Sequence, residues 1–191
     1  MNETPAPALR ERLLGAPLPP VLLAATHGAP VDLSALAAPR TVIYCYPRTS
    51  EPGKPAPTGW DAIPGARGCT PQACAFRDHH HELAELRARV FGLSTQPTSY
   101  QQEMATRLRL PFPVLSDEHF AFTDALGLPT FEVDGMRLLE RLTLIARGGR
   151  IEEVFHPVPQ PGRNAEDVVD WLRSHPLAGQ GRPRPGESPD R

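Results

Sequence analysis

The sequence contains few of the residues that several common protein classes require. Among 191 residues there are three cysteines, aromatic residues make up 6%, and the formal net charge is −2. A charge so close to zero gives no electrostatic reason to bind nucleic acid or an anionic membrane surface. Three cysteines cannot form a disulfide framework, and they are typical of a protein whose thiols are kept reduced.

Long apolar runs are also missing. No stretch approaches the roughly 18 apolar residues that span a bilayer. The first 20 residues contain five prolines together with charged side chains, so they do not form the apolar core of a secretory signal. We therefore expect a cytoplasmic protein that does not enter a membrane, with one domain of ordinary size.

Proline, by contrast, is abundant, with 24 copies. Many lie in the amino-terminal segment, in a stretch from about residue 47 to residue 68, and in the tail. Neither a helix nor a strand can continue through the middle stretch, and a loop of that length in a compact domain is often functional. Its Trp60 is expected to anchor the loop by packing; the alternative is that it lines a site.

Strand and helix patterns alternate through the rest of the chain, which indicates an α/β fold. We expect an amino-terminal arm over residues 1–14, one domain over residues 15–176 and a disordered tail over residues 177–191. Strands are predicted at 21–23, 31–33, 41–46, 90–95, 114–116, 130–133, 138–146 and 151–155. Helices are predicted at 8–14, 69–89, 99–108 and 118–126, and from a cap at Asn164 to His175.

Two cysteines stand five residues apart at the predicted start of a helix. Pro71 suits a first helical turn, which places Cys69 near the positive end of the helix dipole. The thiolate form of Cys69, which is the reactive form, is favoured there. Cys74 lies about 7.5 Å further along the helix axis, whereas a disulfide needs its Cα atoms within roughly 7 Å. A bond between the two would require the first turns to unravel.

The cysteines and the nearby histidines also have structural interpretations that compete with a redox function. A free cysteine is often a small buried apolar residue, and the C-x4-C spacing matches neither a C-x-x-C redox motif nor a zinc site. Cys45, inside an apolar strand, is expected to serve packing. The run His79-His80-His81 invites a metal reading, but adjacent helical residues point about 100° apart and cannot share one ion. We expect a solvated face there, with no metal or cofactor.

The segment from Gly68 to Asp78 resembles the peroxiredoxins, specifically the bacterioferritin comigratory protein class. That class typically reads Gly-Cys-Thr-x-x-Ala-Cys-x-Phe-Arg-Asp, which this chain follows almost residue for residue. The likeness covers roughly residues 15–175 and includes Thr41–Pro47, Pro113–Asp117 and Arg141–Ile145. It implies a thioredoxin-like fold with a central mixed sheet flanked by helices.

The resemblance also implies an activity. Cys69 would attack a peroxide, giving a sulfenic acid, and Cys74 would condense with it into an intramolecular disulfide. A thioredoxin-like or other thiol reductant would restore the dithiol, and the protein would be a monomer or a weak dimer. Arg141 matches the family arginine that contacts the reactive cysteine; on the sequence alone, it could equally lie at a strand edge with its head in solvent.

One departure from the family pattern concerns the peroxide pocket. The family has a threonine three residues before the reactive cysteine, and here that position is Ala66. We expect the 48–68 loop to replace the missing hydroxyl, through Thr49, Ser50 or Thr58. The departure also favours an alternative, a non-catalytic redox sensor or binding module on the same fold. A weaker alternative is a metal-handling protein that uses the cysteines and the histidine run.

Overall fold

A computed structural model describes residues 8–178, and its main feature is a seven-stranded mixed sheet. Strands β3 and β4, and β4 and β5, run parallel, whereas all other neighbours in the sheet are antiparallel. The order across the sheet is β2 (Val31–Asp32), β1 (Leu22–Ala25), β5 (Val114–Ser116), β4 (Ala88–Ser94), β3 (Arg40–Cys45), β8 (Leu142–Arg147) and β9 (Arg150–Phe155). A separate ribbon pairs β6 (Thr130–Val133) with β7 (Met136–Leu139).

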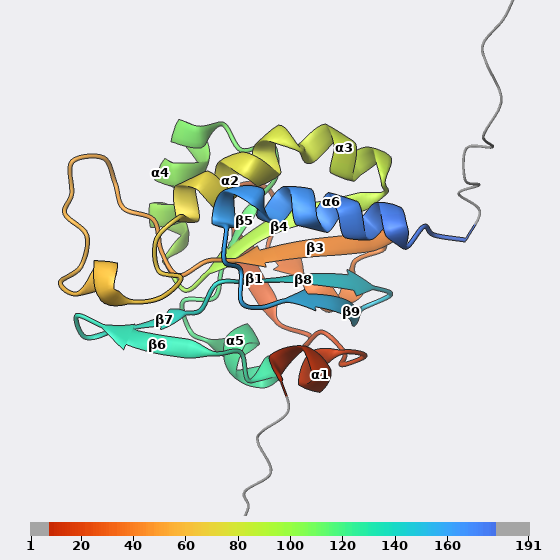
Figure 1. The fold of residues 1–191 in the computed structure, drawn as a ribbon, viewed down its shortest axis with the longest axis horizontal. Coiled ribbons are helices and arrows are strands. Elements are labelled where there is room, and N and C mark those ends of the chain that lie inside the picture. The colour runs from red at the N-terminus through yellow and green to blue at the C-terminus, as the bar shows by residue number, and fades with distance from the viewer. Residues whose placement is uncertain (1–7, 179–191) are drawn as a thin grey trace, which may run out of the picture.

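Helices cover both faces of this sheet (Figure 1). One face carries α2 (Cys69–Asp78), α3 (His80–Glu85), α4 (Thr98–Leu108) and α6 (Asn164–Ser174), and the other carries α1 (Leu9–Leu13) and α5 (Ala121–Leu126). Short 3-10 turns are η1 (Leu33–Ala35), η2 (Trp60–Ala62) and η3 (Pro161–Arg163).

The central strand β3 shows why two cores form. Successive side chains of a strand point to opposite faces, so Val42 and Tyr44 pack under α2 and α6, whereas Ile43 and Cys45 pack against the α1 and α5 side. All six residues of β3 are buried, which matches a strand covered on both faces.

Most predicted elements are present, and the α/β class is confirmed. The predicted helix over 69–89, however, is two helices that meet at His79, where φ is −92° and ψ is 7°. Histidine and aspartate are weak helix formers, and His79 turns its ring to Glu82, whose Oε2 lies 2.9 Å from Nδ1.

The predicted strand over 138–146 is also wrong, because it is split at Glu140 and Arg141. β7 belongs to the small ribbon and β8 to the main sheet, so the chain leaves one ladder and enters another at this point. Arg141 therefore lies between strands, with its guanidinium free to bond outside both sheets.

Asn164 does not cap the last helix as predicted. It is the first helical residue of α6, the cap position falls on Arg163, and the Asn164 amide bonds elsewhere. Residues 1–7 of the predicted arm and residues 179–191 of the predicted tail lie outside the described residues.

Candidate active site

Cys69 is the first residue of α2, immediately after a glycine in the left-handed region. Gly68 has φ 101°, and a Cβ placed on it would lie 2.7 Å from Cγ of Pro161. Only glycine therefore lets the start of α2 lie against η3. Within residues 8–178, the amides of Gly68 and Cys69 have no hydrogen-bond acceptor in the protein, so both remain available to an oxygen bound at this helix start.

The Cys69 sulfur is buried, and two groups contact it. The residue is 5% exposed, its thiol donates to the carbonyl of Ala66 at 3.6 Å, and Nη2 of Arg141 lies 3.1 Å from Sγ. A guanidinium at that distance stabilises negative charge on the sulfur and on an oxygen beside it.

Arg141 is held by carbonyl groups rather than by a carboxylate. It is 4% exposed and donates to the carbonyls of Gly65, Ala66 and Arg67 at 3.2, 3.2 and 3.0 Å. No carboxylate among the described residues pairs with it, so its positive charge is left for the sulfur. The alternative interpretation, an edge position with the head in solvent, is wrong.

A buried amide chain continues from Arg141 into the core. Arg141 donates to Oε1 of Gln72, Nε2 of Gln72 donates to Oδ1 of Asn164 at 2.9 Å, and the Thr143 hydroxyl donates to the same oxygen at 2.6 Å. Gln72, Thr143 and Asn164 are each at most 1% exposed. No sequence signal pointed to this hydrogen-bond chain, because an asparagine at a helix start is usually a cap.

A small cavity of about 290 Å³ opens beside Cys69 and is lined by the 48–68 loop. Thr49 and Ser50 are among its lining residues, whereas Thr58 is exposed and is not. The Thr49 hydroxyl already lies 3.4 Å from Oε1 of Gln96. A larger hollow of about 960 Å³ beyond residues 63–68 does not include Cys69.

Trp60 anchors this loop, as predicted. It is 8% exposed and packs in a cluster with Ala66, Val133 and Leu138. The alternative, that Trp60 lines a site, also holds in part, because Trp60 contributes to the wall of the Cys69 cavity. Ala66 is fully buried in the same cluster, so it is a packing residue where the family has a threonine.

The other two cysteines differ from each other. Cys74 lies partly buried on α2, and its thiol is free, as is that of Cys69. Cys45 is fully buried in β3, and burial raises the pKa of its thiol far above the usual range. Cys45 is therefore a packing residue, as predicted.

The histidine run does not gather around one point. His79 lies 2.9 Å from Glu82, His81 lies 3.6 Å from Glu85, and the ring of His80 lies 5.8 Å from that of Phe112. Among residues 8–178, no three His, Cys, Asp or Glu side chains are grouped so as to hold a metal ion. In the same residues, no helix combines the length and the apolar character needed to cross a bilayer.

Comparison with known proteins identifies the family. The sequence profile described as Redoxin matches residues 3–170. This chain belongs to the Redoxin family. Chloroplastic peroxiredoxin Q of Sedum lineare is 28% identical over 160 residues, covering 84% of this chain and 77% of the relative. The same protein of Arabidopsis thaliana is 25% identical over 160 residues, covering 84% and 67%.

Solved peroxiredoxin structures match the fold. Peroxidoxin BcpB from Mycobacterium tuberculosis superimposes with a TM-score of 0.68 at 26% identity, covering 84% of this chain and 96% of that one. Peroxiredoxin Q from Xanthomonas campestris gives 0.66 at 22% identity, covering 81% and 90%, and shows the fold alone. The chain is thus a peroxiredoxin of the bacterioferritin comigratory protein class with a thioredoxin-like fold, and a thiol-dependent peroxidase. The predicted family, fold and enzyme class are confirmed.

Proposed function

We propose that Cys69 is the peroxidatic nucleophile of this peroxiredoxin and that Cys74 resolves its sulfenic acid. Arg141 stabilises negative charge on the sulfur before the attack and on the departing oxygen during it. The observation that carries the proposal is the Cys69 sulfur at the first turn of α2, 3.1 Å from a buried guanidinium and beside an open cavity.

The first step uses the charge that surrounds the sulfur. The Cys69 thiolate attacks one peroxide oxygen, an S–O bond forms and the O–O bond breaks. The departing oxygen leaves as hydroxide or alkoxide and takes a proton to become water or an alcohol. Arg141 and the amides of Gly68 and Cys69 face the region where negative charge moves from sulfur to oxygen.

The second step requires α2 to open. The Cys74 thiolate attacks the Cys69 sulfenic sulfur, a disulfide forms and the hydroxyl leaves as water after protonation. On an intact helix, the two residues rise about 7.5 Å apart, so the first turns must unwind. A dithiol reductant of thioredoxin type then attacks the disulfide and restores both thiols by exchange. We place this cycle in the cytoplasm, in a monomer or a weak dimer.

A steady-state peroxidase assay coupled to thioredoxin and its reductase tests the proposal. Cys69→Ser should abolish hydrogen peroxide reduction. Cys74→Ser should still form a sulfenic acid that a dimedone probe captures, but it should stop after one turnover. Cys45→Ser is the matched control and should retain the wild-type rate, since Cys45 lies fully buried in the opposite core.

The outcome separates catalysis from the sensor alternative, which the missing hydroxyl at Ala66 favours. A sensor would oxidise at Cys69 once and would not turn over with any thiol reductant. Equal loss of activity in the Cys69 and Cys45 variants, or a mapped Cys69–Cys45 bridge, would contradict the assignment of the nucleophile and its partner.

A further inference from the structure

A second cavity shares a lining residue with the one beside Cys69. Its volume is about 300 Å³, and it is lined on one side by Thr95, Pro97 and Tyr100 and on the other by residues around β7. Arg48 lines this cavity and the Cys69 cavity alike. Arg48 is thus common to both linings, and a molecule with its peroxide at Cys69 would have to pass this guanidinium to reach the second cavity.

Arg48 lacks the partner that a partly buried arginine normally has. Within the described residues 8–178, its Nε is buried without a hydrogen-bond acceptor, and its Nη1 has the Met136 sulfur, a weak acceptor, at 3.3 Å. No carboxylate among the described residues pairs with it. A cation held in this way is unusual unless it binds an anion that enters from outside.

A second unpartnered donor lines the same cavity. Thr95 is 9% exposed, and its hydroxyl is buried without a partner within residues 8–178. The Tyr100 hydroxyl accepts from the amide of Glu51 at 3.1 Å, which leaves its own hydrogen free to donate. The first turn of α4 begins at Thr98, so the positive end of that helix dipole adds to the same preference for an anion.

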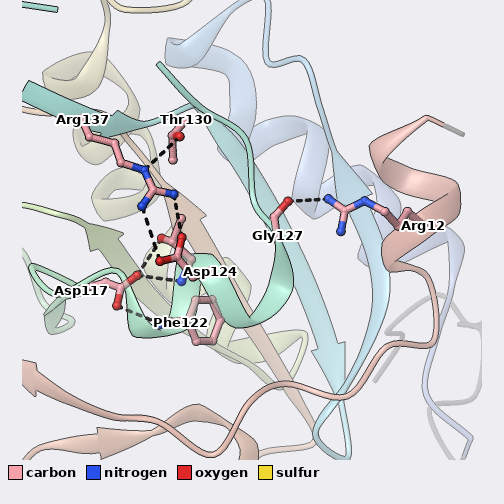
Figure 2. A network of polar contacts seen from close by, with 8 residues as sticks. Arg12, Asp117, Phe122, Asp124, Gly127, Thr130 and Arg137 are labelled. Carbon is pink, nitrogen blue, oxygen red and sulfur yellow. Dashed lines mark hydrogen bonds and ion pairs between the residues drawn. The ribbon is translucent and has the colours of Figure 1, made fainter. Parts of the chain in front are cut away.

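The neighbouring arginine is already occupied. Figure 2 shows Arg137 directed to Asp124 and Thr130: Nη2 lies 2.6 Å from Oδ1 of Asp124, and Nε lies 3.2 Å from the Thr130 hydroxyl. Its guanidinium also lies 4.4 Å from the centre of the Phe120 ring. None of the residues that line the cavity is acidic, so the charge of Arg48 is not balanced there.

We propose that this cavity selects organic hydroperoxides that carry a carboxylate. The carboxylate would accept hydrogen bonds from Arg48 and Thr95, apolar carbons would lie against Phe120, Met136 and Leu138, and the peroxide would reach Cys69. The inference rests on the proposed peroxidase function and adds its substrate class. No chemical step changes, because the carboxylate only positions the peroxide.

The test compares each acid with its own methyl ester. Hydroperoxides of saturated medium-chain carboxylic acids, in a series of increasing chain length, and their esters are assayed for kcat/KM, with hydrogen peroxide as a common reference. The wild-type protein should prefer at least one acid over its ester by about tenfold, the size expected for a charge-assisted hydrogen bond. The preference should peak at one chain length, because the two cavities fix the spacing.

Variants assign the preference to the cavity. Arg48→Gln should reduce the acid-to-ester ratio to about one, Arg48→Lys should restore part of it, and Thr95→Val should lower it by a smaller factor. Arg87→Gln is the matched control, because Arg87 is exposed and precedes β4 at the opposite end of that strand. It should leave the ratio unchanged.

Three outcomes are distinguishable. Failure to reduce hydrogen peroxide overturns the peroxidase proposal itself. Reduction of hydrogen peroxide with equal rates on acids and esters overturns the substrate class alone. A preference for acids that is unchanged in both Arg48→Gln and Thr95→Val also overturns it, because another part of the protein would then bind the carboxylate.

Discussion

The two walls of the Cys69 site are built differently. On the α6 side, Gln72, Thr143 and Asn164 are at most 1% exposed and hold Arg141 through a continuous chain of hydrogen bonds. On the loop side, residues 51–65 are mostly exposed, and the loop projects from the sheet beside the β6–β7 ribbon (Figure 1). The buried wall sets how reactive the sulfur is, and the exposed wall sets what reaches it.

Removing the charge from the buried wall should have the largest effect. Arg141→Met should slow peroxide attack by about a hundredfold, because the guanidinium contacts the sulfur and has no carboxylate to share its charge. It should also slow the alkylation of Cys69 at a fixed pH, because the contact that stabilises negative charge on the sulfur is lost. Stopped-flow kinetics and the alkylation rate measure both effects.

Arg107→Met controls for the loss of an arginine, since Arg107 pairs with Glu103 on the surface of α4. An unchanged alkylation rate in Arg141→Met would mean that the guanidinium plays no part in activating the sulfur.

Oxidation should disrupt the buried wall at the first turns of α2. A Cys69–Cys74 disulfide requires residues 69–76 to leave the helix. Gln72, which donates to Asn164, lies within that stretch. Amide exchange there should accelerate by more than about tenfold in the oxidised protein. Mass spectrometry of exchanged peptides shows this, and Cys74→Ser treated with the same peroxide provides the control. A protected helix in the disulfide form would contradict it.

Removing a member of the buried hydrogen-bond chain that lies further from the sulfur should have a smaller effect on peroxide attack. Asn164→Ala leaves the Gln72 amide and the Thr143 hydroxyl without their shared acceptor, which should lower the free energy of unfolding by about 2 kcal/mol. Peroxide attack should slow by about tenfold, because the Gln72 carbonyl that holds Arg141 gains freedom.

The pH profile of Cys69 alkylation distinguishes positioning from simple loss of stability in this variant. Thr143→Val removes one donor and keeps the shape, so it should preserve the rate better than Asn164→Ala. If Asn164→Ala loses stability and its alkylation profile matches that of the wild type, Asn164 is structural only.

A change at the end of the loop, directly after the exposed wall, should have the smallest effect. Ala66→Thr restores the family residue, but Ala66 is fully buried and its carbonyl already accepts from Arg141 and Cys69. We expect peroxidase efficiency to change by less than about threefold, because this pocket is built without that hydroxyl. The same steady-state assay measures it; a gain of tenfold or more would show that the loop has not replaced the threonine.

Local patterns predicted the parts of this molecule that depend on neighbours in sequence. The strand predicted at 41–46 is the central strand β3, and the strand predicted at 151–155 lies within β9. The resemblance of Arg141–Ile145 to the family strand predicted that Arg141 contacts Cys69, as the structure has it. The sequence alone left open a position at a strand edge.

The rest depends on contacts between distant residues, which one sequence does not display. Gln72 and Asn164 are 92 positions apart, and the asparagine looked like a cap because its local context is that of a helix start. Arg48 carried no signal, since a lone arginine after Pro47 is typical of an exposed loop. Its missing partner becomes visible only when the loop is folded.

Trp60 gives the site an optical reporter. One of two tryptophans in the chain, it belongs to the wall of the Cys69 cavity, whereas Trp171 lies on α6, stacked 4.2 Å from the ring of His175 and below Arg40. The emission of an indole follows the polarity and the mobility of its surroundings. In a protein carrying Trp171→Phe, tryptophan emission therefore comes from the cavity wall alone, and it should change as Cys69 is oxidised, without a label.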